Sequence, residues 1–191
     1  MKYIDLTLHV QKMNRVYKWA ETQPNKERVM GHIGTHVDIY ETKTIPLEYI
    51  STRGIVFDVS HITDREITTD DIDIDYIKPK DFVLFYTGCI QRNPYGSRYY
   101  FNKGVELSWE LIEALIEERI AFIGLDAPDI RKGKEHIEAE KKCEKEKIYV
   151  VENLMNLDAI DPSNPCKIAT MWLEDEDATG LRCRVVAMQP E

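Results

Sequence analysis

The residues best suited to chemistry lie in the stretch MGHIGTHVDIYET, from Met30 to Thr42. It contains His32, His36 and Asp38, and so holds two of the five histidines of the chain. Imidazole and carboxylate groups suit zinc, manganese or iron. In an extended segment, residues two apart point to the same side, so this even spacing lets the three side chains converge on one face. Three protein ligands leave positions open for water, which is the arrangement of a catalytic metal site.

The same stretch also fits a simple turn with histidines on the surface. Gly31 and Gly34 carry no side chain, so the backbone there can bend or approach an ion closely. Two histidines and an aspartate at same-face spacing around these glycines favour the metal site over the turn. His9 and His61 are isolated in the sequence, and we expect both to be surface or hydrogen-bonded polar groups.

The second half of the chain adds three further candidates. Asp126 ends an apolar segment, where α/β folds often place site residues, although Asp126 and Pro128 also fit a plain turn. Glu152 directly follows another apolar segment, so its charge is either exposed at a sheet edge or bound to something cationic. His136, taken alone, is better interpreted as a solvated helix residue.

Apolar and β-branched runs bounded by turn residues predict the strands that must position these groups. The predicted strands are residues 3–10, 54–60, 81–88, 120–126, 148–151, 167–174 and 181–188.

Helices are predicted between some of these strands. Ser108 can cap a helix from about Trp109 to Glu118 that carries one apolar stripe. The polar segment 135–147 is helix-forming, and a short helix begun by Thr68 or Thr69 is an option. Strands and helices mix without strict alternation, and 191 residues suit one domain. We therefore expect a single α/β domain with a mixed β-sheet covered by helices.

Composition excludes several classes of partner. The net charge of -9 argues against nucleic acid, and no segment approaches the ~20 apolar residues of a membrane span. The N-terminus lacks the continuous apolar stretch of a signal peptide. The four cysteines form no CxxC pair and are expected to be reduced thiols. These features predict a cytoplasmic protein that acts on a small molecule.

The sequence resembles the cyclase family of metal-dependent hydrolases, whose best-known members are bacterial kynurenine formamidases. HIGTHVD, residues 32–38, matches the first half of the family motif H-x-G-T-H-x-D-x-P-x-H. Weaker matches follow in the family order: FVLFYTG, IGLDAPDI, a helical segment that ends in Glu-Asn-Leu, and GLRCRVVA. The resemblance covers nearly the whole chain and implies one swivelling β/β/α domain over residues 1–191. Family members assemble as dimers or larger, which implies a homo-oligomer, a dimer or a tetramer.

The resemblance also implies a set of five metal ligands: His32, His36, Asp38, His136 and Glu152. They would hold two divalent ions, Zn²⁺ or Mn²⁺, with Asp38 bridging. Glu152 and Asp126 would take part in catalysis, Asp126 from beside the site. The implied function is hydrolysis of a C–N bond, in an amide, an N-formyl group or a cyclic amide of a small molecule, by a metal-activated hydroxide.

Two positions depart from the family motif. Tyr40 replaces its proline, and Thr42 replaces its last histidine. Threonine does not titrate near pH 7, and losing a general acid or base typically costs ~10²–10⁴-fold in rate. We therefore expect slow hydrolysis of N-formylkynurenine, and faster amide hydrolysis after Thr42→His. Glu41 lies next door, but in a strand it would point away from Asp38 and Tyr40.

The departures keep two alternatives open beside the hydrolase. One is a family member with altered catalysis that acts as a metal- or ligand-binding protein. The other is a plain α/β domain without metal. The presence of five candidate ligands favours the hydrolase, because a purely structural site needs only four ligands and no open position.

Overall fold

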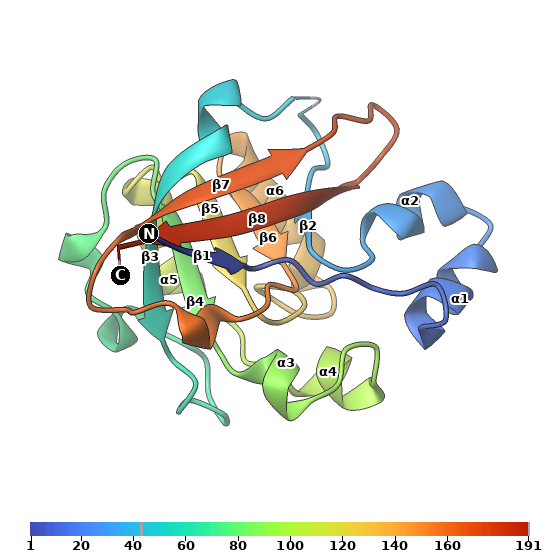
Figure 1. The fold of residues 1–191 in the computed structure, drawn as a ribbon, viewed down its shortest axis with the longest axis horizontal. Coiled ribbons are helices and arrows are strands. Elements are labelled where there is room, and N and C mark those ends of the chain that lie inside the picture. Colours follow the sequence, from blue (N-terminus) through green and yellow to red (C-terminus); the bar gives the residue numbers. More distant parts are fainter. Residues whose placement is uncertain (43, 191) are drawn as a thin grey trace.

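The computed structural model describes residues 1–42 and 44–190, and its centre is an eight-stranded sheet. The strand order is β1-β8-β2-β6-β5-β4-β3-β7, and β7 also pairs with β8, so that the sheet closes into a barrel (Figure 1). The strands are β1 (Lys2–Asp5), β2 (His36–Asp38), β3 (Ser51–Asp58), β4 (Phe82–Tyr86), β5 (Phe122–Leu125), β6 (Tyr149–Glu152), β7 (Cys166–Trp172) and β8 (Gly180–Gln189).

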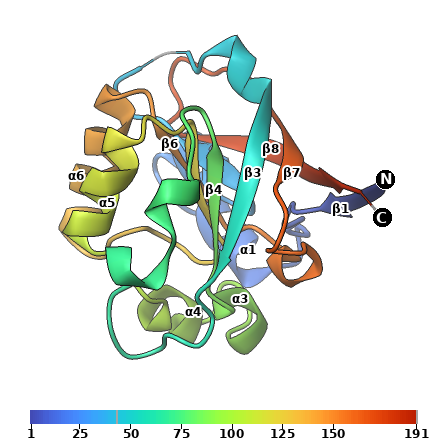
Figure 2. The ribbon, with the colours of Figure 1, turned by 90° about the vertical axis from the view of Figure 1, so that its left-hand side faces the viewer.

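The sheet is mixed, as predicted. Strands β3, β4, β5 and β6 pair in parallel, whereas β1, β2, β7 and β8 make antiparallel pairs. Parallel neighbours need long crossover connections. Helices α5 (Trp109–Glu117) and α6 (Glu135–Lys145) lie within two of these crossovers and cover the outer face of the parallel strands, opposite β7 and β8 (Figure 2). The expected α/β fold is confirmed, but the sequence did not predict that the sheet closes.

Helix α5 forms where its cap and its apolar stripe predict it. The Ser108 side chain accepts a hydrogen bond from the backbone N–H of Leu111, at 3.1 Å. Leu111, Ile112 and Leu115 are buried against the sheet. Thr68 likewise caps a short 3-10 helix, η2 (Thr69–Asp71).

The remaining helical elements are short, and most of them carry no apolar stripe that predicts them. They are α1 (Arg15–Glu21), α2 (Lys26–Gly31), η1 (Leu47–Ile50), η2 (Thr69–Asp71), η3 (Ile74–Tyr76), α3 (Cys89–Arg92), α4 (Arg98–Lys103) and η4 (Leu157–Ala159). Among the described residues, none of these helices has the length and apolar character that crossing a bilayer requires.

Two hydrophobic clusters pack on the two faces of the sheet. Val151 belongs to the cluster inside the barrel, and Val150 belongs to the outer cluster under α5 and α6. Alternation along β6 therefore turns the next residue, Glu152, to the outer face, toward α6. The same alternation on β2 places Val37 inside the barrel.

The structure shortens one predicted strand and agrees with the prediction for the cysteines. The strand predicted for residues 3–10 pairs regularly only as far as Asp5, and Thr7 then forms an isolated bridge with Leu154. The four cysteines are free and buried, in agreement with the expectation of reduced thiols.

Candidate metal centre

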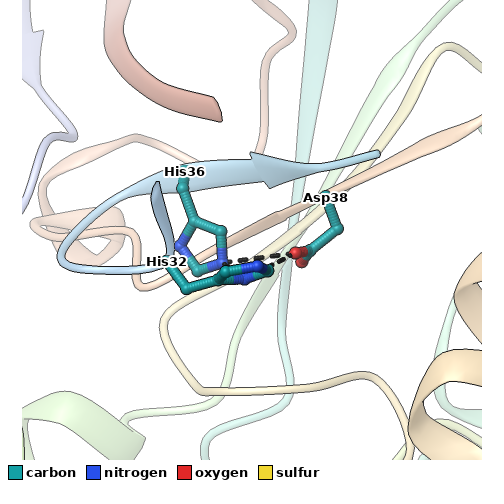
Figure 3. Close-up of side chains that lie close together, drawn as sticks. All are labelled: His32, His36 and Asp38. Atoms are coloured by element: carbon teal, nitrogen blue, oxygen red, sulfur yellow. Dashed lines mark hydrogen bonds and ion pairs between the residues drawn. The ribbon is translucent and has the colours of Figure 1, made fainter. Parts of the chain in front are cut away.

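The first part of the site is built on β2 and the turn before it. Because Val37 points into the barrel, His36 and Asp38 share the opposite face of the strand. His32 follows the end of α2, and its ring points back toward both side chains (Figure 3). Gly34 links the two histidines with φ +77, and a Cβ there would lie 2.5 Å from the backbone oxygen of Leu8. Only glycine fits this turn.

The side chains of His32, His36 and Asp38 converge on one point. Asp38 Oδ1 lies 3.0 Å from His32 Nδ1 and 3.4 Å from His36 Nε2. The two ring nitrogens are 3.1 Å apart. The even spacing in the sequence therefore does bring the three groups together, within the reach of one metal ion.

Hydrogen bonds behind the two rings fix which nitrogen faces the cluster. His36 Nδ1 lies 2.9 Å from the carbonyl oxygen of Gly34, which can only accept, so Nδ1 carries the proton. His32 Nε2 lies 3.0 Å from Thr179 Oγ1 and can donate there. His32 Nδ1 and His36 Nε2 are then the nitrogens that face Asp38. Such outer hydrogen bonds orient metal ligands.

A second network holds His36 in place. Asn153 donates from its side chain to the Gly34 oxygen, at 3.1 Å, and accepts a 2.5 Å hydrogen bond from the Tyr100 hydroxyl. Glu152 stands directly opposite His36 in the β2–β6 register, so the two side chains lie on the same face. His36 Nε2 is 3.5 Å from Glu152 Oε2.

The second part of the site comes from α6 and the end of β5. His136 Nδ1 lies 2.7 Å from Asp129 Oδ1, and the backbone N–H of Asp129 donates to Glu152 Oε1, also at 2.7 Å. Asp129, His136 and Glu152 form one cluster of possible ligands, and Asp38, Glu140 and Glu152 form another. The five residues expected from the sequence therefore occupy three adjoining clusters. The Asp38–Glu140–Glu152 cluster lies between the other two, sharing Asp38 with the first and Glu152 with the second.

Asp129 and Glu140 are site residues that the sequence reasoning missed. Glu140 lies four residues after His136, so one face of α6 presents both side chains. That spacing was a usable signal, but the segment is mostly polar and predicts a solvated helix. Its burial follows only from packing against the barrel.

Burial and neighbouring charges shift the pKa values of these groups. Burial raises the pKa of both Glu140 and Glu152 well above the usual range, and the carboxylate of Asp38 adds to the effect. Burial alone would lower the pKa of His36 and His136, but adjacent carboxylates raise each to about 9. Burial would raise the pKa of Asp38, but the neighbouring His36 and His32 hold it below its usual value.

The arrangement leaves buried acceptors without a partner. Asp38 Oδ2 and Glu140 Oε1 accept no hydrogen bond from any residue that the structure describes. Buried acceptors that lack a donor cost free energy, and a cation is the group that converging carboxylates and imidazole lone pairs bind. The donor set therefore fits one or two divalent cations.

The two departures from the family motif have different surroundings. The Tyr40 hydroxyl donates to Glu140 Oε2, at 2.7 Å, and lies 3.3 Å from His136 Nε2. The Thr42 hydroxyl instead donates to Glu144 Oε1, at 2.7 Å. Tyr40, and not Thr42, therefore brings a side chain from this loop to the ligand clusters.

Glu144 is the anchor of the loop. Its buried carboxylate accepts hydrogen bonds from three consecutive backbone N–H groups, those of residues 40–42. The Glu41 side chain pairs with Lys141, at 3.1 Å, and so points away from the ligands as expected.

Asp126 lies at the end of β5, outside the three ligand clusters. Its buried Oδ1 accepts hydrogen bonds from the backbone N–H and the hydroxyl of Thr87, at 2.7 and 2.6 Å. This contact fixes the loop after β4, and a catalytic part for Asp126 stays a prediction. His9 and His61 are exposed, as expected.

The family model Cyclase matches residues 4–132. No curated protein sequence matches the chain.

Several solved structures share the fold. One is described as a potential metal-dependent hydrolase with cyclase activity; it is 23% identical, with a TM-score of 0.77 over 100% of this chain and 98% of that chain. Isatin hydrolase A from Labrenzia aggregata is 20% identical, with a TM-score of 0.79 over 100% and 94% of the two chains. A metal-dependent hydrolase described from Bacillus stearothermophilus is 21% identical, with a TM-score of 0.72 over 97% of each chain.

Proposed function

The chain belongs to the cyclase family, and from this premise we propose that it is a metal-dependent hydrolase of a C–N bond in a small molecule. The bond would belong to an amide, an N-formyl group or a cyclic amide. The observation that carries the proposal is the set of three adjoining ligand clusters, in which the Asp38–Glu140–Glu152 cluster shares Asp38 with one neighbour and Glu152 with the other. Solved neighbours that are named isatin hydrolases support isatin as one substrate to test.

In this proposal, His32, His36 and Asp38 hold one divalent ion, and Glu152 and His136 help to hold a second. When bound, such ions lower the pKa of a water molecule and polarise a carbonyl oxygen. The chain's own contribution is to fix the ligands: the Gly34 carbonyl oxygen orients His36.

Tyr40 is the hydroxyl nearest to the second cluster. Burial, together with the charges of Asp38 and Glu140, raises its pKa far above the usual value, so the hydroxyl keeps its proton. It therefore acts as a hydrogen-bond donor toward Glu140 and not as a base.

The alternative function is metal or ligand binding without catalysis. The observation that favours it is the orientation of Thr42, which is bonded to Glu144, so that this position offers no proton donor to the ligands. The hydrolase remains the better conclusion, because a site that only binds metal does not need two clusters with shared carboxylates.

A substrate panel separates the two functions. Metal-free protein reconstituted with Zn²⁺ or with Mn²⁺ is assayed on isatin, an N-formyl aromatic amine and an activated ester. The hydrolase predicts turnover that disappears on chelation and returns with metal. Stoichiometric metal binding without turnover on any of the three classes would favour the binding protein.

The same proposal includes the identity of the metal, the oligomeric state of the protein and its location in the cell. We propose Zn²⁺ or Mn²⁺, two ions for each chain, in a cytoplasmic homo-oligomer, dimeric or tetrameric, that binds neither nucleic acid nor membrane. Exposed Trp19 and Phe101 line a groove beside α1 and α4 and support association between chains. Elemental analysis and sedimentation at micromolar concentration test these statements, and a monomer would contradict the oligomer.

A further inference from the structure

We propose that Glu140 is itself a metal ligand, and that it gives the second ion position a preference for a hard divalent cation, Mn²⁺ or Mg²⁺. The first position, with two imidazoles, would prefer Zn²⁺. This inference deepens the proposed function, on which it rests only in that the centre binds metal.

The position of Glu140 carries the first step. Its side chain is 2% exposed, and Asp38, Glu140 and Glu152 each offer an oxygen within 4.8 Å of the other two. The Tyr40 hydroxyl donates a hydrogen bond to Glu140 Oε2. The other oxygen, Oε1, is buried and has no hydrogen-bond donor among the described residues. One oxygen is therefore restrained and the other is free to bind an ion.

The balance of charge carries the second step. In the described part of the chain, no lysine or arginine forms an ion pair with Asp38, Glu140 or Glu152. The ion-pair partners of these carboxylates are histidines alone. Three carboxylates at this separation would repel one another if all were charged, and a divalent cation between them would offset that repulsion.

The difference between the two clusters carries the third step. His32 and His36 supply two nitrogens to the first, with one oxygen from Asp38. The cluster that contains Glu140 is made of carboxylates alone, with His136 beside it. Imidazole suits zinc, whereas carboxylate oxygens suit Mg²⁺ and Mn²⁺. The two positions should therefore differ in the ion that they select.

The test compares Glu140→Gln with Glu138→Gln, which changes an exposed glutamate on the same helix. Each metal-free protein receives one equivalent of Zn²⁺ and is then titrated with Mn²⁺, followed by electron paramagnetic resonance. Elemental analysis gives the stoichiometry. Wild type and Glu138→Gln should bind one Zn²⁺ and one Mn²⁺. In Glu140→Gln, zinc should be retained and Mn²⁺ binding weakened at least ~10–100-fold, the range for an outer partner of a ligand.

A structural measurement keeps the test independent of how the variant folds. Anomalous scattering at the Zn and Mn edges from crystals of the wild-type protein should place Mn²⁺ next to the Glu140 carboxylate. Equal Mn²⁺ affinity in Glu140→Gln, or an Mn²⁺ position away from Glu140, would overturn the inference. Ordered binding of both ions without any hydrolysis would leave the inference standing and refute only the proposed function.

Discussion

The hydroxyl of Tyr40 donates a 2.7 Å hydrogen bond to Oε2 of Glu140, a residue one hundred positions further along the chain. This contact joins the loop after β2 to helix α6. It also places a neutral donor at the position where the family motif has proline.

Tyr40→Phe should therefore destabilise the metal-loaded protein. The change removes a hydrogen bond to a charged group, which is worth about 1.5–3 kcal/mol. Urea-induced unfolding with saturating metal measures the loss, and Tyr99→Phe, at an exposed tyrosine, is the control. Equal stability of the two variants would mean that the hydroxyl contributes nothing to the loop.

His36→Ala should abolish metal retention at the first position. His36 is buried, and its Nε2 faces both Asp38 and Glu152, so no neighbouring side chain can replace it. Elemental analysis after gel filtration measures the loss, and His61→Ala, at an exposed histidine, should keep the wild-type content. An unchanged metal content in His36→Ala would show that the ligands are assigned incorrectly.

Gly180→Ala tests how tightly β8 holds the His32 ring. A Cβ at Gly180 would lie 2.8 Å from His32 Nδ1 and 2.9 Å from two other ring atoms, so the ring must shift from its place in the cluster. We expect a loss of about 1–3 kcal/mol in the free energy of unfolding, as for other overpacked sites. Gly104→Ala is the control, because its nearest neighbours would be at 3.7 Å and 3.8 Å. Zinc binding should weaken in Gly180→Ala alone, and equal binding in both variants would contradict the argument.

For Thr42→His, the structure predicts a different result from the one that the family motif suggests. The Thr42 hydroxyl is bonded to the buried Glu144, so a larger ring at this position enters that contact and not the ligand clusters. We expect a loss of about 1–3 kcal/mol in stability, the cost of forcing a larger side chain into a packed site, and no gain in amide hydrolysis. Increased hydrolysis in this variant would show that the loop can turn its side chain toward the metal.

Asp126→Asn should change how stability depends on pH. Burial raises the pKa of Asp126 above its ordinary value of 3.8. The stability that the neutral carboxyl contributes is therefore complete below about pH 4 and is lost as the pH rises through the raised pKa. The variant does not titrate there, so its stability relative to wild type should increase with pH. Chemical unfolding at several pH values from about 4 to 7 measures this trend, and a constant difference would contradict it.

The sequence by itself determined the features that depend on local pattern. The cap at Ser108 and the apolar stripe after it are set by residues close together in the chain, and the structure has them where they were expected. The strands are also found, although the first is shorter than predicted. The convergence of His32, His36 and Asp38 is local as well, because an extended strand after a glycine turn brings nearby residues together.

Only the tertiary structure decided the second half of the site and the closure of the sheet. Helix α6 is mostly polar, and the four-residue spacing from His136 is a weak local sign that separates the buried Glu140 from the exposed Glu138. The difference arises because α6 packs over β6 and meets the Tyr40 loop, contacts that join distant parts of the chain. Pairing of β7 with β8 closes the barrel in the same non-local way. Burial and strand partners are properties of the assembled fold, so a pattern of neighbouring residues cannot specify them.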